Sequence, residues 1–516
     1  METFCLSQTK DSIKFSQIVK AIGKVRVYEQ SSKESKEPEE ITGIAYDSRR
    51  IQPGFLFVAV RGTSSDGRQF IGSAMDKGAV AVLGDDLEDF VRPNAVFLEV
   101  DNVRLAMAHA AATFYGKPSK HLDLVGITGT NGKTTTAYLV RSVFESAGIR
   151  SGLLGTIEYI TGAEKEPGAA PLSVPAVRTT PESVDLQRYL HEMVKNDLKA
   201  AVMEVSSHAL SLKRIHGCTY RAAVFTNLTR DHLDFHKTMD KYFDVKRELF
   251  SHLQKDGFAV LNTDDEYGRK LKDSLPAKTI SYGINAPADI RALDIKNGVS
   301  SVSFKILYRG RLYRVESGLI GYHNIYNMLA AFGVSVGFGI SADTTLKGLS
   351  CIQGVPGRFE RVEAGQDFLV LVDYAHTDDA LSRAIRSARS LTRQGRVITV
   401  FGCGGDRDKG KRSKMGRVAS WLSDYVILTT DNPRSEEINN IFGEIRTGIS
   451  RYNYLVIPER ERAIRHAVMI TSPGDVVLIA GKGHENYQEI YGSRLPFSDR
   501  DAAVEAIKIL QGVKDK

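Results

Sequence analysis

A glycine-rich segment has the residue types of a loop that binds the phosphates of ATP: Gly129-Thr130-Asn131-Gly132-Lys133-Thr134-Thr135. An apolar run precedes it and apolar residues at helical spacing follow it, as in a strand–loop–helix phosphate site. In such a loop the backbone N–H groups face the anion, Lys133 contacts the terminal phosphates and the Thr134 hydroxyl binds Mg²⁺. The spacing departs from the usual GxxxxGK[ST] pattern, because Ile127 stands where the first glycine is usual. The flanking strand and helix still predict a phosphate loop rather than a plain glycine turn.

Acidic and histidine residues that could bind a metal follow two later apolar runs. Glu204 ends a predicted strand, where an acid can contact the Mg²⁺ of a phosphate loop. His232 and His236 are four residues apart, a spacing that on a helix places both on one face. No HExxH pattern is present and no cysteine is near, so zinc is not expected there. Asp231 and Asp234 beside these histidines favour a polar site.

Four apolar runs in the C-terminal third each lead into a polar or glycine-rich loop. The predicted strands are residues 368–372, 397–401, 425–429 and 476–480, and the loops are residues 373–376, 402–408, 431–434 and 481–485. In doubly wound sheets, ligands bind beyond the carboxyl ends of the strands. These loops therefore predict a binding face on one edge of one sheet. Asp373 and His376 lie on this edge without a predicted role.

The elements that must position these residues predict an α/β protein of three domains. The length of 516 residues suits about three domains of ordinary size. We predict a small α/β domain at 1–119, a P-loop ATPase-like central domain with a mostly parallel sheet at 120–355, and a Rossmann-like domain at 356–516. Further predicted strands are residues 55–60, 79–83, 122–127, 200–205 and 222–226.

Composition and charge exclude several classes of protein. Residues are 42% apolar and 25% charged, and no run of about 18 apolar residues exists, so no membrane insertion is expected. The first residues lack the basic start and apolar core of a signal peptide. Four dispersed cysteines fit a reducing cytoplasm. The net charge is +7, and the basic residues are scattered along the chain. This distribution favours small anionic ligands, and no nucleic-acid partner is expected.

The motifs and their order along the chain resemble those of the Mur ligases, which build the peptide stem of bacterial peptidoglycan. The phosphate loop, the segments 203–208 and 227–234, and Gly321-Tyr322-His323-Asn324-Ile325-Tyr326-Asn327 occur in that order in this family. The resemblance covers nearly the whole chain. It implies a cytoplasmic, ATP-dependent acid–amino-acid ligase that forms ADP and phosphate through an acyl phosphate, with Mg²⁺ as cofactor. The segments 431–434 and 481–485 resemble those of the member that adds the third residue of the stem.

The resemblance also implies roles for individual residues. Catalytic roles fall on Lys133, Glu204, His232 and Lys246. The implied ATP contacts are Gly129, Thr130, Asn131, Gly132, Lys133, Thr134, Thr135, Asn324 and Asn327. The implied Mg²⁺ ligands are Thr134, Glu204, His232 and Lys246, the last carbamylated. The implied contacts to UDP-N-acetylmuramoyl-dipeptide are Ser48, Thr179, Thr180, Ser206 and Arg214, with a second uridine loop at Thr63-Ser64-Ser65. Contacts to the amino acid fall on Arg407, Asp431, Asn432, Pro433, Arg434, Gly481 and Glu485.

Arg434 favours meso-diaminopimelate over lysine as the amino acid. Diaminopimelate carries a carboxylate and an ammonium at its far end, whereas lysine carries only the ammonium. The fork of donors on arginine binds a carboxylate through two hydrogen bonds, and Glu485 can bind the ammonium. Arg434 therefore predicts meso-diaminopimelate as the amino acid, and the resemblance implies UDP-N-acetylmuramoyl-dipeptide and ATP as the other substrates. We expect a monomer. Closure of the domains is expected to exclude water, and Arg358, near a predicted hinge, could then contact ATP.

Three alternatives stay open at this point. One is a lysine-adding ligase of the same family, and another is a folylpolyglutamate-type ligase, which would not need the loop at 431–434 in this form. A third, from a different class, is a P-loop protein that binds nucleic acid, suggested by the basic balance. The absence of a basic stripe and the presence of four ligand loops argue against the third.

Overall fold

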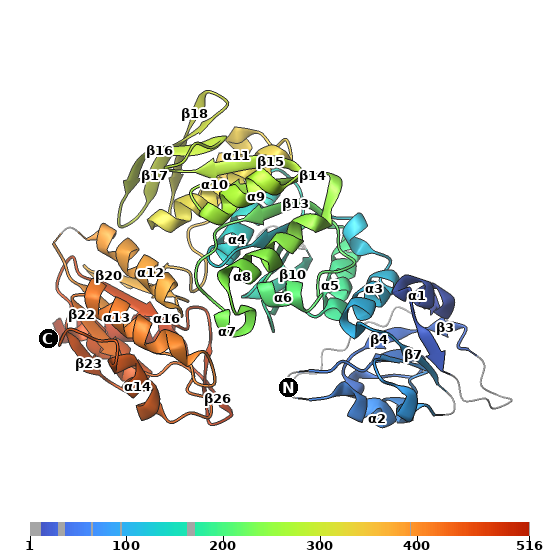
Figure 1. Ribbon diagram of the computed structural model, residues 1–516. Coiled ribbons are helices and arrows are strands. Elements are labelled where there is room, and N and C mark those ends of the chain that lie inside the picture. The colour runs from blue at the N-terminus through green and yellow to red at the C-terminus, as the bar shows by residue number, and fades with distance from the viewer. Residues whose placement is uncertain are drawn as a thin grey trace. The chain divides into compact units, whose positions relative to one another are not determined.

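The computed structural model describes residues 12–28, 37–62, 65–92, 95–162, 171–392 and 394–514. The chain forms two compact units (Figure 1). Unit 1 comprises Met1–Gly126, Ile149–Arg221 and Glu248–Gly257, and unit 2 comprises Ile127–Gly148, Ala222–Arg247 and Phe258–Lys516. Three strands run across these boundaries: β8 (Asp123–Thr128), β13 (Tyr220–Phe225) and β14 (Leu253–Asn262). The predicted limits of the three domains, at 119/120 and 355/356, stay predictions.

Unit 1 contains a small sheet with helices on both faces. The strand order is β2-β7-β6-β5-β4, parallel except for β2. Successive residues of β5 point to opposite faces, as the strand period of two requires. Leu56 and Val58 pack with helices α1 and α3, whereas Phe57 packs with α2. The elements of this part are β1 (Ile13–Lys14), α1 (Phe15–Ile22), β2 (Arg26–Tyr28), β3 (Glu40–Ile41), β4 (Gly43–Ala45), η1 (Ser48–Arg50), β5 (Phe55–Val58), η2 (Gly67–Phe70), α2 (Ile71–Asp76), β6 (Ala81–Gly84), η3 (Glu88–Phe90), β7 (Val96–Glu99) and α3 (Val103–Phe114).

The rest of unit 1 presents Glu204 at the end of a buried strand. Strand β12 pairs parallel with β9, and β9 pairs antiparallel with β10 and β10 with β11. The elements of this part are η4 (Pro118–Lys120), β9 (Ser151–Leu154), β10 (Glu158–Gly162), β11 (Leu172–Pro175), α5 (Ser183–Lys195), β12 (Ala200–Glu204), α6 (Ser207–Ser211) and η5 (Glu248–His252). Every residue of β12 is buried, so its polar end residue must be hydrogen-bonded within the protein.

Unit 2 begins with the glycine loop and its helix and continues into a mixed sheet. Strands β14, β15 and β16 pair in parallel, and β16, β17 and β18 form an antiparallel meander. The elements of this part are α4 (Lys133–Ser146), α7 (Leu233–His236), α8 (Met239–Arg247), α9 (Glu266–Ser274), β15 (Lys278–Gly283), β16 (Ile290–Asn297), β17 (Val302–Tyr308), β18 (Arg311–Ser317), α10 (Tyr322–Gly337) and α11 (Ala342–Cys351).

The C-terminal part of unit 2 is a sheet of order β19-β20-β24-β21-β22-β23, parallel except for β19 (orange to red in Figure 1). Helices α12, α13 and α14 cover one face, and α15 and α16 cover the other. Its elements are β19 (Glu360–Val362), β20 (Leu369–Asp373), α12 (Asp378–Leu391), β21 (Val397–Phe401), η6 (Lys409–Lys411), α13 (Arg412–Leu422), β22 (Tyr425–Leu428), α14 (Ile438–Arg446), β23 (Tyr454–Val456), α15 (Arg460–Met469), β24 (Val476–Ala480), β25 (Tyr487–Ile490), β26 (Ser493–Pro496) and α16 (Asp499–Lys514).

The α/β class predicted from the apolar runs is confirmed. Every predicted strand exists, with ends shifted by no more than about two residues. The carboxyl ends of β20, β24, β21 and β22 meet at one edge because these neighbouring strands are parallel, and the four predicted loops follow them. The meander β16–β18 was not predicted, because its buried residues alternate with partly or fully exposed ones and form no continuous apolar run. Among the described helices, each is too short or too polar to span a bilayer.

A buried ion pair supports this edge of the C-terminal sheet. Arg460 and Asp499 are both fully buried, and the Nε and Nη2 of Arg460 donate to the two carboxylate oxygens at 2.6 and 2.8 Å. The same guanidinium donates to the carbonyls of Thr430 and Ala480 at 3.1 and 3.0 Å. These carbonyls immediately precede two of the predicted loops, so the ion pair positions the ends of the strands that carry them.

Replacing Asp499 with alanine is expected to lower the free energy of unfolding by about 3–5 kcal/mol, because Arg460 then stays buried without its counter-charge. Chemical denaturation followed by far-UV circular dichroism measures the change. The control is Arg462→Ala on helix α15, the helix that also carries Arg460. The Arg462 side chain is mostly exposed, and its Nε lies 3.8 Å from a carboxylate oxygen of Glu459. An exposed pair contributes little. Equal transitions for the two variants would contradict this role of Asp499.

Candidate functional site

The glycine loop of unit 2 links strand β8 to helix α4 by a turn that only glycine can form at two positions. Gly129 has φ 147° and Gly132, the N-terminal cap of α4, has φ 86°. A Cβ atom on Gly129 would overlap the hydroxyl of Thr226, and one on Gly132 would overlap the side-chain oxygen of Asn327. The turn directs the first backbone N–H groups of α4 away from the strand, as an anion site at a helix N-terminus requires.

The segment that follows β13 holds this loop by hydrogen bonds to its backbone. Asn227 accepts from the N–H of Asn131 at 3.0 Å and donates to the carbonyl of Asn131 at 3.0 Å. Thr226 donates to the same carbonyl at 2.6 Å. The N–H of Thr130 donates to the carbonyl of Asn227 at 2.9 Å. Asn227 was not assigned a site role from the sequence, although it lies within the motif 227–234.

Two lysine ammonium groups contact the carbonyls of the glycine loop. Lys133 donates to the carbonyls of Gly129 and Thr130, both at 2.9 Å. Lys246 on helix α8 is 1% exposed and donates to the carbonyl of Gly129 at 2.8 Å. Burial, together with the charge of Lys133, holds the pKa of Lys246 well below its usual value. The neutral amine of Lys246 is thereby favoured relative to an exposed lysine.

Asn324 and Asn327 lie in the first turns of α10 and are both buried. Asn327 accepts from the hydroxyl of Thr136 on α4 at 3.3 Å and donates to the side chain of Asn324 at 2.9 Å. Asn324 donates to the carbonyl of Ile320 at 2.8 Å. The two asparagines therefore connect helix α10 to the start of α4, beside Gly132. This contact gives them a positioning role whether or not they contact a base.

Residues from the C-terminal part of unit 2 contact the glycine loop. Arg358 donates through Nη2 to the hydroxyl of Thr134 at 3.0 Å, and its guanidinium lies over the ring of Tyr374 at 4.6 Å. Asp379, in the first turn of α12, accepts from the side chain of Asn131 at 3.2 Å and from the hydroxyl of Thr229 at 2.8 Å. The position of Arg358 near a predicted hinge suggested a contact with ATP. Asp379 lies in no sequence motif, and no contact was predicted for it.

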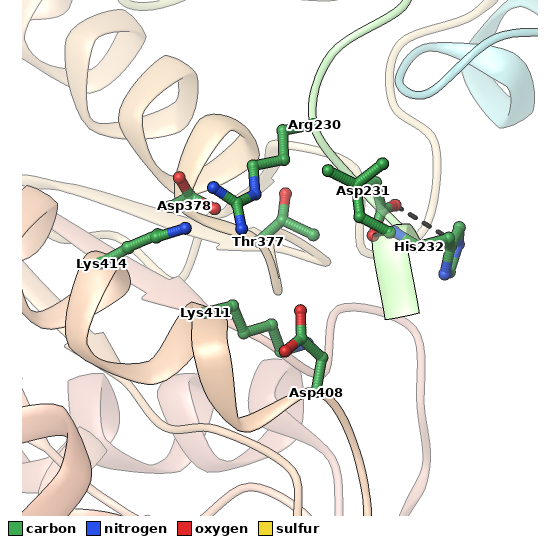
Figure 2. A pocket seen from close by; sticks show the side chains of 9 residues that line it. Arg230, Asp231, His232, Thr377, Asp378, Asp408, Lys411 and Lys414 are labelled. Atoms are coloured by element: carbon green, nitrogen blue, oxygen red, sulfur yellow. Dashed lines mark hydrogen bonds and ion pairs between the residues drawn. The ribbon is translucent and has the colours of Figure 1, made fainter. Parts of the chain in front are cut away.

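His232 lies at the edge of a small pocket lined by charged side chains of unit 2 (Figure 2). His232 adopts a left-handed conformation, φ 52°, and its Nε2 lies 3.4 Å from a carboxylate oxygen of Asp231. The pocket has room for about a water molecule, at about 20 Å³. Its lining residues are Arg230, Asp231, His232, Leu233, Thr377, Asp378, Asp408, Lys411 and Lys414.

The charges of this pocket keep Asp231 ionised. Burial raises the pKa of the Asp231 carboxyl, but the positive charges of His232, His376, Lys133 and Lys411 together lower it below its usual value. His236, four residues after His232, is buried and stacks on the ring of Tyr242 with ring centroids 4.8 Å apart. The α7 helix begins only at Leu233, so the histidine pair on one helical face does not form.

The part of the candidate site that lies in unit 1 centres on Glu204, which is 1% exposed. One carboxylate oxygen accepts from the backbone N–H of Thr156 at 2.8 Å, and the other accepts from its hydroxyl at 3.1 Å. The Thr156 hydroxyl also donates to that of Thr179 at 3.2 Å. Thr180 donates to the carbonyl of Glu204 at 2.9 Å and lies 3.3 Å from the hydroxyl of Ser206. Glu204, Thr179, Thr180 and Ser206 thus lie together, and the roles predicted for them stay predictions.

Arg214 and Ser48 occupy separate places in unit 1. Arg214 is buried, its Nη2 lies 2.8 Å from a carboxylate oxygen of Glu182, and its Nη1 donates to the carbonyl of Thr180 at 3.1 Å. This places it beside the Glu204 group. Ser48 begins the helix η1, and its carbonyl accepts from Lys77 at 3.0 Å. Of the predicted uridine loop, Thr63 and Ser64 lie outside the described residues.

The C-terminal sheet edge brings together most residues predicted to bind an amino acid. Arg434 adopts φ 53°, donates to the carbonyl of Gly405 at 2.6 Å and lies 3.6 Å from a carboxylate oxygen of Glu489. Gly481 has φ 118°, and a Cβ there would lie 2.7 Å from a carboxylate oxygen of Asp431. Pro433 is buried in the same loop, whereas Arg407 is exposed.

A buried lysine that the sequence did not single out lies at the centre of this edge. Lys482 is fully buried and donates to the side-chain oxygen of Asn432 and to a carboxylate oxygen of Glu485, each at 2.9 Å. Asn432 donates to the same oxygen of Glu485 at 2.9 Å. One carboxylate oxygen of Glu485 is therefore already neutralised. The signal that could have found Lys482 is a lysine directly after an apolar strand and between two glycines.

Each unit offers an oxygen donor of the kind that Mg²⁺ binds, Thr134 in unit 2 and Glu204 in unit 1. Mg²⁺ prefers oxygen ligands and binds few protein groups beside phosphate oxygens and water. Thr134 offers a hydroxyl at the start of α4, and Glu204 offers a buried carboxylate whose orientation Thr156 holds. Gly155 lies directly beside this carboxylate: a Cβ atom at position 155 would lie 2.6 Å from a carboxylate oxygen of Glu204.

Comparisons with known proteins place these parts in one family. The Mur ligase middle domain matches residues 127–335, the Mur ligase glutamate ligase domain matches residues 357–483, and the Mur ligase family catalytic domain matches residues 40–115.

Two curated relatives carry the same name, UDP-N-acetylmuramoyl-L-alanyl-D-glutamate–2,6-diaminopimelate ligase. The protein of Solibacter usitatus is 46% identical over 475 residues, which is 91% of this chain and 94% of the relative. That of Geobacter metallireducens is 43% identical over 91% of this chain and 95% of the relative. A solved structure of a ligase with this name is 31% identical, with a TM-score of 0.66, and the match covers 97% of this chain and 99% of that one.

Replacing Asn227 with alanine is expected to weaken the binding of ADP about tenfold, because the two hydrogen bonds from its side chain to Asn131 are lost. Calorimetric titration of the full chain with Mg²⁺–ADP measures the change. The control is Asn285→Ala, an exposed asparagine of unit 2 whose side chain makes one long contact of 3.5 Å to Asp264. If both variants bind ADP as the parent does, the hydrogen bonds from Asn227 do not hold the loop.

Proposed function

Because this chain belongs to the Mur ligase family, we propose that it adds meso-2,6-diaminopimelate to UDP-N-acetylmuramoyl-L-alanyl-D-glutamate. The reaction consumes ATP, forms ADP and phosphate, and supplies a precursor of peptidoglycan. Similarity to relatives named for this reaction over 91% of the chain supports the proposal. The observation that carries the choice of amino acid is Arg434, held at the carboxyl edge of the C-terminal sheet with its guanidinium against the Gly405 loop. The enzyme acts as a cytoplasmic monomer.

The reaction begins with activation of a carboxylate. The glutamyl carboxylate of the nucleotide substrate attacks the γ-phosphorus of ATP, the bond to the bridging oxygen breaks, and ADP leaves, giving an acyl phosphate. The loop Gly129–Thr135 binds the ATP phosphates with backbone N–H groups, and Lys133 neutralises charge on the transferring group. The ammonium of Lys133 exchanges its loop carbonyls for phosphate oxygens. Asn324 and Asn327 hold the start of α4 in place for these contacts.

The second half of the reaction forms the amide. The amine of diaminopimelate attacks the acyl carbon, the amine proton is lost, and phosphate leaves. The protein needs no serine or cysteine nucleophile, because its contribution is to position the reactants and stabilise charge. Thr179, Thr180, Ser206 and Arg214 bind the muramoyl-peptide part, and Ser48 binds the uridine. In unit 1, Arg214 lies beside Thr180, which supports one shared binding surface for these residues.

Metal ligands come from four residues. Mg²⁺, when bound, neutralises charge on the phosphate oxygens during transfer. Thr134, Glu204, His232 and carbamylated Lys246 are the residues that would hold it. Carbamylation joins the neutral amine of lysine to CO₂, with loss of one proton, and converts the side chain into a carboxylate. The complete burial of Lys246 and its contact with the carbonyl of Gly129 support this proposal, since a cation is costly there.

The amino-acid site combines a cationic and an anionic end. Arg434 binds the distal carboxylate of diaminopimelate through its guanidinium fork, exchanging its contact with Glu489 for the substrate. Glu485 binds the distal ammonium through the carboxylate oxygen that Lys482 does not contact. Asp431, Asn432, Pro433 and Gly481 shape the loops between these two groups. Arg407 is exposed on the neighbouring loop and approaches the substrate from that side.

The amino-acid preference tests the role of Arg434. We expect kcat/KM, measured by ADP release, to be at least about a hundredfold higher with meso-diaminopimelate than with lysine, because two charged hydrogen bonds are at stake. Arg434→Leu is expected to remove most of this difference and to leave the binding of ADP unchanged. Arg451→Ala, an exposed arginine over Trp421, is the control. Equal use of both amino acids by the unmodified enzyme would refute the argument from Arg434.

Lys246→Ala is expected to lower kcat by about 10²–10³-fold, the usual cost of losing one electrostatic group of a transition state. Added short carboxylates should restore part of the activity, because they replace the lost carbamate. Intact-mass measurement should show the parent enzyme heavier than its sequence mass by one CO₂. The variant should lack this addition. Lys241→Ala, an exposed lysine of the same helix, is the control. Full activity of Lys246→Ala without added carboxylate would count against carbamylation.

A further inference from the structure

Two histidines and a glutamate gather in unit 1 at a place that the ligase reaction does not use. His216, Glu248 and His252 each offer a ligand atom, and these atoms all lie within 4.8 Å of one another. His216 follows the substrate residue Arg214 in the loop after α6, and the other two lie in helix η5. All three side chains are half-buried. The set His₂Glu is one that proteins use to bind Zn²⁺.

The spacing of these atoms suits a tetrahedral ion. The Nε2 of His216 lies 3.4 Å from a carboxylate oxygen of Glu248. Zn–N and Zn–O bonds of about 2.0–2.2 Å place two ligands of a tetrahedron roughly 3.3–3.5 Å apart. The rings of His216 and His252 lie with centroids 4.8 Å apart at 79°.

The surroundings hold both imidazoles ready for a metal. Burial and the neighbouring charges lower the pKa of His216 to about 4, and burial also lowers the pKa of His252. Both rings are therefore neutral at pH 7, which is the form that binds metal. The Nδ1 atom of His216 is buried without a hydrogen-bond partner.

Two neighbours show what would change when an ion binds. The ammonium of Lys213 lies 2.8 Å from the same oxygen of Glu248, so it balances the carboxylate in the ion-free protein and would have to move. Cys218 is not a ligand, because it is fully buried, its sulfur accepts from Gln187 at 3.1 Å, and burial raises the pKa of its thiol to about 12. The thiol therefore stays protonated at neutral pH.

We propose that His216, Glu248 and His252 bind a divalent first-row transition ion, with Zn²⁺ the best match and water as the fourth ligand. The ion links the loop after α6 to helix η5, which are more than thirty residues apart in the chain. It thereby restrains the backbone next to Arg214. Only this last consequence rests on the proposed function, because the ion site itself is defined by the three side chains. Mg²⁺ does not compete, since it prefers oxygen to imidazole ligands.

The test is metal binding by the full chain after chelator treatment. Calorimetric titration with Zn²⁺ at pH 7.5, with excess Mg²⁺ present, should show a single tight site, and Co²⁺ should give the intense visible absorption of a tetrahedral complex. His252→Gln and Glu248→Gln should each weaken Zn²⁺ binding at least about a hundredfold, because even the loss of an outer contact costs about 10–100-fold. Lys213→Gln should strengthen binding several-fold, since the competing ammonium is gone.

The matched control is His109→Gln, a neighbouring half-buried histidine outside the set, which should leave Zn²⁺ affinity within about twofold of the parent. Melting curves of the metal-free variants identify any that fail to fold, and Zn²⁺ should raise the melting temperature of the parent but not of His252→Gln. Absence of Zn²⁺ binding by the parent, or Zn²⁺ affinities of His252→Gln and Glu248→Gln equal to that of the parent, would overturn the proposal. These readouts do not require ligase activity, so they stand apart from the test of the proposed function.

Discussion

The hydrogen bonds between Asn227 and the backbone of Asn131 are the contacts that hold the glycine loop Gly129–Thr135. Asn227 pairs with both the N–H and the carbonyl of Asn131, so the turn between β8 and α4 is held by a segment about one hundred residues later in the chain. The turn has no room for a Cβ at Gly129 or Gly132, because Thr226 and Asn327 fill that space. A loop held this closely needs little further ordering when phosphates bind, and preorganised N–H groups stabilise charge most effectively.

Buried positive charge is the second constraint, and it is met in the same way at three places in unit 2. Lys246 donates to a carbonyl of the glycine loop, Lys482 to Asn432 and Glu485, and Arg460 to Asp499 and two strand-end carbonyls. Each of these side chains donates to oxygen atoms at the end of a strand or in the loop that follows one: the glycine loop for Lys246, the loops after β22 and β24 for Lys482, and the carbonyls of Thr430 and Ala480 for Arg460. Removing one oxygen partner would leave a cation buried and unpaired, which is why these side chains couple stability to the loops that carry the chemistry.

Most of the fold was predictable because buried parallel strands appear in the sequence as continuous apolar runs. The strands that lead into Glu204, the glycine loop and the four C-terminal loops were found in this way, whereas β9, β10 and β11 beside Glu204 were not. The meander β16–β18 was not found either, because the buried residues of β17 and β18 alternate with partly or fully exposed ones and form no continuous apolar run. The helical face expected for His232 and His236 does not form, because His232 takes a left-handed conformation before α7 begins. A four-residue spacing cannot reveal where a short helix starts.

The sequence by itself determined the residue types of the separate loops: a glycine-rich loop between a strand and a helix, an acid at the end of a buried strand, and an arginine after an Asn-Pro step. These follow from residue types that are close together in the chain. Only the tertiary structure decided which distant groups share a contact, such as Arg434 with Gly405 and Glu489, Asp379 with Asn131, and His216 with Glu248 and His252. The physical reason is that such contacts depend on the order and register of strands and on the packing of helices. Local residue patterns set the elements, but the pairing of elements follows from burying all their apolar faces together.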